Sequence, residues 1–473
     1  MHTVSQNNKK MSNTLILNTM KKIYIIIALL MTGMIAEAQT SVWNGSRRLW
    51  TNGEGTESSP FLIESAENLA FLSYMVNKGV DTHGLYFTLT TDIDLNGSED
   101  LPWYPIGMGN RWFSDDGCDR ISDPSFNVNN VFAGHFDGNG HSIYNLYVDG
   151  MDYAGLFGRI SNWYNEGATI ENVIIESGHV KGTYSGGIVG DCQGLVFITN
   201  CSNNAEIIGT TVAGGIVGSG TKAIRNCNNT GNVKGSTKAG GIVATQAKTI
   251  TESFNSGDIN IEGEIAGGII GMSSSGLTII QNCYNTGSLS GHATNGMGGI
   301  AGHVVGHSSQ VLNCYNVGSL LNEGGETGGL FGNSSTDCTA ENDYYLNTCG
   351  GWGVGTNKTA EEMRDPDFVD MLNYNTDVWG FDVNNINDGY PILEGNTTST
   401  LETTAATMAV YPNPAKDNFT VEGTGLLTIT NVLGQKVMEK AIEERCIITL
   451  PEGIYLLRLT DGNATATRKV VVY

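Results

Sequence analysis

A short apolar segment bordered by glycines recurs seven times through the middle of the chain. Its second glycine, or the equivalent residue, stands at positions 155, 187, 215, 241, 268, 299 and 329, so the spacing runs from 26 to 32 residues. A repeat of this length over so many copies indicates stacked units that bury their apolar side chains against their neighbours. The pattern therefore predicts a solenoid.

An asparagine marker recurs in phase with these segments. Its slot holds Asn145, Asn172, Asn200, Asn226, Glu252, Asn282, Asn313 and Asn342. Three residues after the slot, another asparagine stands at Asn203, Asn229, Asn255, Asn285 and Asn316. Asparagines that face inward would bond from turn to turn as a ladder, whereas outward ones could bind sugars. The periodic spacing favours the ladder.

Each unit is too short and too rich in glycine for two helices, and its apolar pieces carry many β-branched residues, as strands do. We therefore predict an all-β fold, a right-handed parallel β-helix with one turn per unit. Paired glycines are expected at corners that need positive φ or a close backbone approach. An aliphatic row would line the interior, formed by Ile188, Ile216, Ile242, Ile269 and Ile300.

Short helices are predicted at both ends of the stack, because the ends of a solenoid must be covered. Ser65 can cap a helix over 66–78. Near the other end, Thr359 and Glu362 form a capping box, and Pro366 would break or restart the helix that follows. Both helices are expected to act as lids.

The N-terminus has the pattern of a secretory leader. Lys21 and Lys22 precede an apolar stretch over 23–35, and a small-x-small pattern then ends at Ala36 and Ala38, directly before Gln39. About 13 apolar residues are too few to span a hydrocarbon layer of about 30 Å. We expect cleavage before Gln39, export, and no membrane-spanning segment in the mature chain. Met20 is the alternative start of translation.

These signals divide the chain into six parts. The assigned parts are a leader at 1–38, an N-terminal cap with the first turns at 39–150, repeats at 151–345, a C-terminal cap at 346–394, a threonine-rich linker at 395–407 and a separate module at 408–473. The module contains several short strand-like segments, so a small Ig-like β-sandwich is expected.

The charge of the chain excludes one class of partner. It has 25 Lys and Arg against 48 Asp and Glu, a net charge of −23 in 473 residues. Nucleic-acid binding needs a concentrated basic patch, and no basic run longer than two residues follows the leader. A nucleic-acid partner is therefore not expected.

The repeats resemble the GLUG motif of bacterial surface proteins. The segments that carry the resemblance are Gly186 to Gly190 with its repeats, the asparagine–cysteine pairs, and a lead-in that includes Asp92 to Leu95 and Phe136 to Ile143. The resemblance covers about residues 50–394. It implies an architecture and says almost nothing about activity.

The C-terminal module resembles the type A sorting domain of the type IX secretion system of Bacteroidota. The matching positions are Tyr411, Pro412, Asn413, Pro414, Gly434, Gly453, Tyr455 and Lys469. The resemblance implies a Gram-negative bacterium whose type IX machinery carries the chain across the outer membrane and removes the module. It also implies release from the cell or attachment to its surface.

Candidate catalytic groups are few. Asp92, Asp94 and Asp137 could form a carboxylate site for polysaccharide cleavage if they met Arg111 or Arg120 in one groove. Asp137 opens a turn-like sequence, and Asp92 and Asp94 alternate with apolar residues, so structural roles are favoured. The sequence predicts no catalytic and no cofactor-binding residue.

No metal site is predicted either. His303 and His307 have a spacing that suits a metal-binding helix, but the glycines beside them argue against a helix. The segment from Asp382 to Ile386 starts like a calcium loop and lacks a glycine at its sixth position, so an ordinary turn is expected.

Two further rows are chemically ambiguous. Phe254, Tyr284 and Tyr315 share one slot, and they form either an exposed stripe for a glycan or protein ligand or a covered part of the core. Cys201, Cys227, Cys283 and Cys314 are expected to be small buried residues, with disulfides between neighbouring turns left open.

These observations favour an exported surface or secreted β-helical protein without catalytic activity, an adhesin or binding module. Its expected partners are the type IX secretion machinery and either glycans or extracellular proteins of a host. A polysaccharide lyase or hydrolase on the same fold is the first alternative. A structural component of a surface layer or matrix is the second.

Overall fold

The computed structural model describes residues 40–109, 130–164, 166–273, 276–305, 308–334, 338–394, 408–411, 415–416, 418–431, 436–442, 445–461 and 464–473. The expected leader at 1–38 and linker at 395–407 lie outside these ranges. The chain divides into two compact units, residues 1–396 and residues 397–473.

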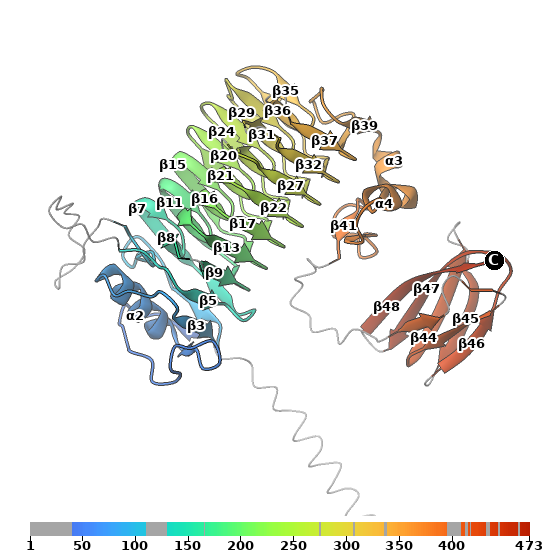
Figure 1. Cartoon of the computed structure of the whole chain (residues 1–473), viewed down its shortest axis with the longest axis horizontal. Coiled ribbons are helices and arrows are strands. Elements are labelled where there is room, and N and C mark those ends of the chain that lie inside the picture. Colours follow the sequence, from blue (N-terminus) through green and yellow to red (C-terminus); the bar gives the residue numbers. More distant parts are fainter. Residues whose placement is uncertain are drawn as a thin grey trace, which may run out of the picture. The chain divides into compact units, whose positions relative to one another are not determined.

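The first unit is a parallel β-solenoid of about nine turns, which Figure 1 shows as a stack of strands. A typical turn adds a strand to each of four parallel sheets, and neighbouring strands in a sheet come from successive turns. This arrangement confirms the predicted all-β parallel β-helix.

Sheets 1 and 2 follow one another along each turn. Sheet 1 consists of β2 (Phe61–Ile63), β3 (Tyr86–Leu89), β5 (His135–Asp137), β9 (Ala168–Glu171), β13 (Val196–Thr199), β17 (Ala223–Arg225), β22 (Thr249–Thr251), β27 (Ile279–Gln281), β32 (Gln310–Leu312) and β37 (Thr339–Glu341). Sheet 2 consists of β1 (Ser41–Val42), β4 (Ile93–Asp94), β6 (Ser142–Tyr144), β10 (Ile174–Ile175), β14 (Ser202–Asn203), β18 (Asn228–Asn229), β23 (Phe254–Asn255), β28 (Tyr284–Asn285), β33 (Tyr315–Asn316), β38 (Tyr344–Leu346) and β39 (Thr356–Lys358).

Sheets 3 and 4 complete the turn. Sheet 3 begins with β7 (Leu146–Ala154), β11 (Gly178–Gly186) and β15 (Glu206–Gly214). It then divides into one row of β19 (Val233–Gly235), β24 (Ile259–Ile261), β29 (Leu289–Gly291) and β34 (Leu320–Asn322), and a second row of β20 (Lys238–Gly240), β25 (Ile265–Gly267), β30 (Gly296–Gly298) and β35 (Thr327–Gly328). Sheet 4 consists of β8 (Phe157–Asn162), β12 (Val189–Gly194), β16 (Val217–Thr221), β21 (Val243–Ala247), β26 (Ile270–Met272), β31 (Ala301–Val304) and β36 (Phe331–Ser334).

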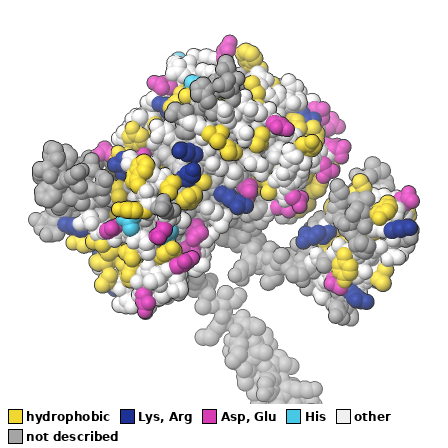
Figure 2. Space-filling model, in the orientation of Figure 1, with side chains coloured by type: hydrophobic (Ala, Val, Ile, Leu, Met, Phe, Trp, Pro, Cys, Tyr) yellow, Lys and Arg dark blue, Asp and Glu magenta, His cyan; other side chains and the backbone are white. Residues whose placement is uncertain are grey.

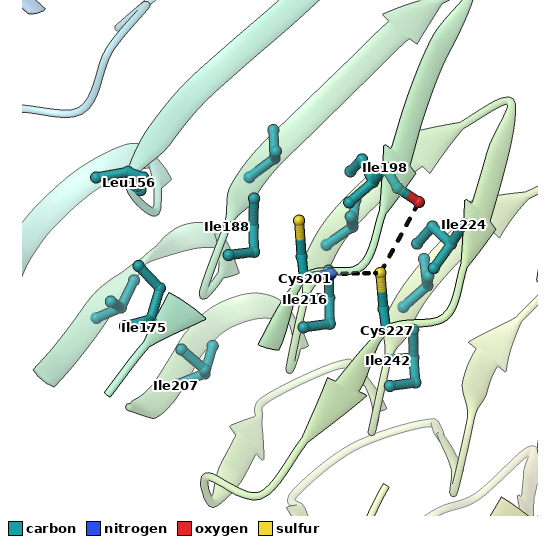
Figure 3. Packing of buried hydrophobic residues seen from close by; sticks show 14 of the residues in the cluster. Leu156, Ile175, Ile188, Ile198, Cys201, Ile207, Ile216, Ile224, Cys227 and Ile242 are labelled. Atoms are coloured by element: carbon teal, nitrogen blue, oxygen red, sulfur yellow. Dashed lines mark hydrogen bonds between the residues drawn. The ribbon is translucent and has the colours of Figure 1, made fainter. Parts of the chain in front are cut away.

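The predicted aliphatic row lies in the interior. Figure 3 shows Ile188, Ile216 and Ile242 one above another, and all three are fully buried. The residue that follows each of them, such as Val189, is also buried in the same core. A sheet 3 strand ends just before this pair and a sheet 4 strand begins within it. Because the chain turns there, consecutive side chains can both face inward.

The later asparagine row forms the expected ladder inside the solenoid. The side-chain amide of Asn203 donates to Oδ1 of Asn229 at 2.8 Å, and the same bond links Asn229 to Asn255, Asn255 to Asn285 and Asn285 to Asn316. Each amide also donates to a backbone carbonyl two residues further on, as Asn229 does to Gly231. Each buried amide of the row therefore has a partner in its own turn and another in a neighbouring turn.

The earlier asparagine row marks a different constraint. Its residues have φ between 51° and 59° in every turn, Glu252 included. Asparagine tolerates this left-handed region better than most residues. The side chains also bond between turns, as Asn226 does to Asn200 at 2.8 Å and Asn342 does to Asn313 at 2.8 Å.

The cysteine row is buried, and the described cysteines carry free thiols. The Sγ of Cys227 lies 3.8 Å from the carbonyl oxygen of Ile198 in the preceding turn, and the backbone N–H of Cys201 lies 3.4 Å from the Sγ of Cys227 (Figure 3). Burial raises the pKa of the Cys201 thiol well above its usual value. The row is therefore the small buried filling that the sequence predicted.

Helices flank the solenoid. In α2 (Ala66–Asn77) the Ser65 side chain accepts a hydrogen bond from the backbone N–H of Asn68, and the helix buries Leu69, Leu72 and Val76 in the solenoid core. Figure 1 shows α2 beside β3 at the N-terminal end.

The C-terminal helices lie elsewhere than expected. α3 (Ala360–Arg364) begins at the predicted capping box of Thr359, and α4 (Pro366–Leu372) starts at Pro366. Their buried side chains pack against the outer side of sheet 2 and against β40 (Trp379–Gly380) and β41 (Ile392–Leu393). They cover the flank of the stack because that flank carries a row of aromatic rings.

The second unit contains two antiparallel sheets around one core. The first sheet has β42 (Ala409–Tyr411), β43 (Asn418–Glu422) and β46 (Arg445–Thr449), and the second has β45 (Lys436–Ile442), β44 (Gly425–Asn431), β47 (Gly453–Asp461) and β48 (Ala464–Val472). Phe419 from the first sheet and Leu457 from the second share a hydrophobic cluster. Among the described residues of the whole chain, none of the helices is long and apolar enough to cross a membrane.

Candidate functional site

Several predicted positions lie outside the part of the chain that the structure describes. They are the cleavage residues Ala36, Ala38 and Gln39, the motif residues Pro412, Asn413, Pro414 and Gly434, and also Arg111, Arg120 and His307. The remaining motif residues lie on strands of the second unit, with Tyr411 in β42, Gly453 and Tyr455 in β47 and Lys469 in β48.

The three candidate carboxylates hold turns together. Oδ1 of Asp94 accepts hydrogen bonds from the backbone N–H of Asn96 and from the Asn145 amide, at 2.7 and 2.8 Å. Asp137 does the same for Asn139 and Asn172. Oδ1 of Asp92 lies 3.0 Å from both the backbone N of Ser142 and Nδ1 of His141. These contacts support the structural role over a catalytic one.

The two candidate metal sites have ordinary explanations. His303 lies on strand β31. Both carboxylate oxygens of Asp382 accept hydrogen bonds from backbone N–H groups, including those of Ile386 and Gly389, so this segment is a turn closed by its own aspartate. Among the described residues, no group of three or more His, Cys, Asp or Glu side chains is arranged to hold a metal ion.

The aromatic stripe is covered, so its interpretation as a ligand surface is corrected. Tyr284 is 3% exposed and Tyr315 is fully buried, while Phe254 packs at the edge of the same cluster. The Trp379 ring lies 5.5 Å from the ring of Tyr315. The segment between 359 and 393 lies over the rings, because removing their apolar surface from water is energetically favourable.

A different group of aromatic side chains reaches the surface, some exposed and some half-buried. Trp163 and Tyr164 lie in the turn between β8 and β9 and are 74% and 66% exposed. The His83 ring meets Tyr164 edge-on at 4.7 Å, and the rings of Tyr86 and His135 stack at 4.2 Å. We call these five residues the aromatic patch. Figure 2 shows hydrophobic, histidine and acidic side chains gathered over the region of β3 and β5.

Buried hydrogen bonds hold the segments of the aromatic patch together. The amide of Asn162, at the end of β8, donates to the carbonyl oxygens of Ala133 and Gly167 at 2.8 and 2.7 Å. Its Oδ1 accepts from the backbone N–H of Tyr164. Thr82 Oγ1 accepts from the N–H of Ala133. Hydrogen bonds of Asn162 therefore anchor the chain next to the exposed rings at Tyr164 and at Gly167, which lowers the entropy lost on binding.

The patch carries acceptors rather than cations. Burial lowers the pKa of His135, so its ring is neutral at pH 7. Burial, with the nearby carboxylates of Glu57 and Glu166, raises the pKa of the Tyr86 hydroxyl. A hydrogen bond from the backbone N–H of His83 lowers the pKa of Asp81, which stays charged. Aromatic surface beside carboxylates can contact the C–H faces of a sugar and accept hydrogen bonds from its hydroxyls.

The repeat pattern of the sequence does not reveal this patch. Its signal is the pair Trp163 and Tyr164 within a polar, glycine-containing turn, where large rings gain nothing from local structure. The other rings lie 28 to 80 residues before Trp163 in the sequence, and they meet only because the solenoid stacks its turns.

Comparison with known proteins identifies the second unit. Residues 409–473 match the family described as the secretion system C-terminal sorting domain. This confirms the sorting domain that the motif residues suggested. It implies handling by the type IX secretion machinery and a secreted or cell-surface protein.

The chain also has more distant likenesses. It is similar to Halomucin of Haloquadratum walsbyi, 29% identical over 172 residues, and to the "Putative Gly-rich membrane protein" of Evansella cellulosilytica, 28% identical over 159 residues. The aligned parts are 36% and 33% of this chain but only 2% and 15% of those proteins. A crystal structure described as a "putative immunoglobulin A1 protease" from Bacteroides ovatus has 22% identity and a TM-score of 0.46, over 73% of this chain and 95% of that one.

Proposed function

We propose that this chain is an exported glycan-binding protein of the adhesin class, displayed on or released from the surface of a Gram-negative bacterium after its leader and sorting domain are removed. In this proposal the repeats are GLUG-type units that form a rigid support. The aromatic patch is the contact surface for the ligand.

One observation carries the proposal. Trp163 and Tyr164 are large rings that are 74% and 66% exposed, next to the anchored Asn162 and near carboxylates and the neutral imidazole of His135. Exposed tryptophan and tyrosine are the side chains that most often dominate binding surfaces. A rod exported to the exterior meets extracellular glycans and host proteins first. The ligand is expected to be uncharged, because a chain with a net charge of −23 repels polyanions.

A binding experiment tests this function. The purified protein is titrated with neutral polysaccharides, such as glucans, mannans and galactans, and the size of each polysaccharide is measured afterwards. We expect retention without shortening, and a loss of about ten- to hundredfold in affinity for the variant Trp163→Ala/Tyr164→Ala, since central aromatic contacts contribute about 1.4–2.8 kcal/mol.

Tyr374→Ala is the matched control, because Tyr374 is as exposed as Trp163 but belongs to the segment after α4. It should bind as the parent protein does. Equal binding by the parent and by the double variant would overturn the role of the patch. Shortened polysaccharides would favour the lyase or hydrolase alternative instead.

A further inference from the structure

A pocket lies within the segment from 359 to 393 that covers sheet 2. Three of the side chains that line it, Met363, Val369 and Pro391, are apolar and buried. Two more, Phe381 and Val383, are 38% and 61% exposed, so the pocket opens to solvent. Its volume is about 160 Å³. A cavity of about 150 Å³ lined by apolar side chains can hold a benzene molecule, so there is room for one aromatic ring or one large aliphatic side chain.

Polar contacts hold the walls of this pocket in place. Oδ2 of Asp382 accepts a hydrogen bond from the backbone N–H of Gly389 at 2.9 Å, which closes the turn that carries one wall. Nη2 of Arg364, at the end of α3, donates to Oδ2 of Asp388 at 2.8 Å. The same guanidinium lies 4.4 Å from the centre of the Tyr390 ring. A ligand therefore meets a shape that is already formed, which lowers the cost of binding.

The surroundings of the pocket are strongly acidic. Residues 359–393 contain eight Asp and Glu but only one Lys or Arg, namely Arg364, with Lys358 directly before them. Figure 2 shows acidic side chains gathered over the region of α3 and α4. The carboxylates of Asp365 and Asp382 line the pocket itself. Polyanions and anionic lipid surfaces are therefore repelled, whereas a cationic partner is attracted.

Apolar side chains surround the opening. Phe381, Val383 and Ile386 all lie between β40 and β41, and all three are exposed, Ile386 by 65%. Exposed apolar side chains that cluster within a polar surface mark sites of interaction with other molecules. The pocket and these side chains thus form one apolar surface bordered by carboxylates.

We infer that this pocket binds a basic segment of another protein, which places one aromatic or large aliphatic side chain in the pocket and its Lys or Arg side chains beside the surrounding carboxylates. The inference is independent of the proposed glycan-binding function, and it gives the solenoid a second kind of partner at a second surface.

Volume and charge together select this partner. Pockets that enclose a whole small molecule measure about 300–1,000 Å³, so a pocket of about 160 Å³ suits a single anchoring side chain of a larger ligand. The excess of carboxylates favours cationic side chains next to that anchor, because interfaces pair surfaces of opposite charge. The one arginine of the segment does not offset this preference, since Asp388 already pairs with Arg364.

Matched peptides test the inference directly. The purified full chain is titrated with a short synthetic peptide that carries one phenylalanine between two pairs of lysines. We expect this peptide to bind at least about tenfold more tightly than the same peptide with alanine in place of phenylalanine, because only the ring fills the pocket. A version with glutamates in place of the lysines should not bind, and added salt should weaken binding by screening the charges. No binding of the first peptide, or equal binding of the alanine peptide, overturns the inference.

Variants then locate the site. Val383→Lys puts a cation beside the pocket and should weaken binding of the phenylalanine peptide at least about tenfold, whereas Val383→Glu should bind it at least as tightly as the parent protein. Both changes are at an exposed position, so the fold should tolerate them. Phe381→Ala removes part of one wall and should weaken binding about fivefold or more. Leu321→Ala is the control, because Leu321 is 65% exposed but lies in β34 of the solenoid.

The remaining outcomes are equally decisive. Parent-like binding of the peptide by both Val383→Lys and Phe381→Ala contradicts the site. Trp163→Ala/Tyr164→Ala should bind the peptide as the parent does, and loss of binding in this variant alone would move the site to the aromatic patch. Binding of phosphatidylcholine vesicles that is lost in Phe381→Ala, without binding of the peptide, would assign this surface to a membrane and contradict the protein partner.

Discussion

At the scale of single residues, one contact explains why the two repeated markers stay in phase. In the five central segments the second glycine faces the inner asparagine ladder, and an added Cβ on Gly241 would lie 2.4 Å from Cγ of Asn255 and 2.1 Å from the Gly268 carbonyl oxygen. The same pairing joins Gly215 to Asn229 and Gly268 to Asn285. The amide and the missing side chain thus occupy complementary volumes in each of these five turns.

This contact predicts the effect of a single methyl group. Gly241→Ala should destabilise the solenoid by about 2–4 kcal/mol, because the backbone of the next turn cannot move away without breaking the ladder. Urea unfolding followed by circular dichroism measures the change. Gly276→Ala is the control, since an added Cβ there meets no heavy atom within 4 Å. Equal stability of the two variants would contradict this account of the repeat.

A second feature at this scale is the buried carboxyl group of Asp343. Asp343 occupies the slot that is cysteine in four other turns, and its Oδ1 accepts a hydrogen bond from the backbone N–H of Cys314 at 2.8 Å. Its Oδ2 is buried without a hydrogen-bond partner among the described residues. Burial raises the pKa of this carboxyl well above its value of 3.8 in the unfolded chain. The folded state therefore holds the proton to higher pH than the unfolded state does.

A pH dependence follows with a definite sign. Between the two pKa values the folded protein binds more protons than the unfolded chain, so the free energy of unfolding falls as pH rises through that window. The contribution is complete below about pH 3.8 and lost above the folded-state pKa. Asp343→Asn should remove this slope and unfold at higher urea than the parent at pH 8. Glu361→Gln, at an exposed position, should keep the pH dependence of the parent protein. The same pH dependence in Asp343→Asn would contradict the assignment of this effect to Asp343.

At the scale of elements, the segment from 359 to 393 behaves as a cover for sheet 2. The rings of Phe254, Tyr284 and Tyr315 stack at 4.8 and 5.1 Å along successive turns. The Tyr315 hydroxyl donates to the Pro391 carbonyl oxygen and accepts from the Asn387 amide at 2.8 Å. Helix starts at Thr359 and Pro366 were predictable because capping is local. The surface that these helices cover could not be predicted, because it is formed by aromatic rings from separate turns that lie side by side only in the folded solenoid.

Loss of the central ring of the cover should loosen the whole segment. Trp379→Ala is expected to cost about 3–5 kcal/mol, since the indole is buried against the stacked rings of Tyr284 and Tyr315 and its removal leaves a cavity. Faster amide exchange in 359–393, with unchanged exchange in sheets 1 and 3, is the measurement. Unchanged exchange throughout would show that the segment does not depend on this contact.

At the scale of the whole molecule, the sorting domain and the proposed binding surface belong to different units. The sorting domain has its own core of two small sheets, and the solenoid has a continuous core that runs through its turns. Local patterning is enough to specify a solenoid, because each turn contacts mainly its neighbours. The fold was therefore the most predictable property of the chain. The binding surfaces are less predictable, since no single repeat contains one.

The sequence by itself determined the period, the strand content, the inner ladder and the sorting domain. All of these depend on residues close together in the chain or on positions that repeat, such as Asn229, Gly215 and Ile216. Only the tertiary structure decided which rows face outward. It buried Tyr284 and Tyr315 beneath the segment from 359 to 393, assigned Asp94 and Asp137 to turns, and exposed Tyr164 beside His83. The reason is physical: periodicity fixes which residues stack on one another, but exposure depends on what the rest of the chain leaves uncovered.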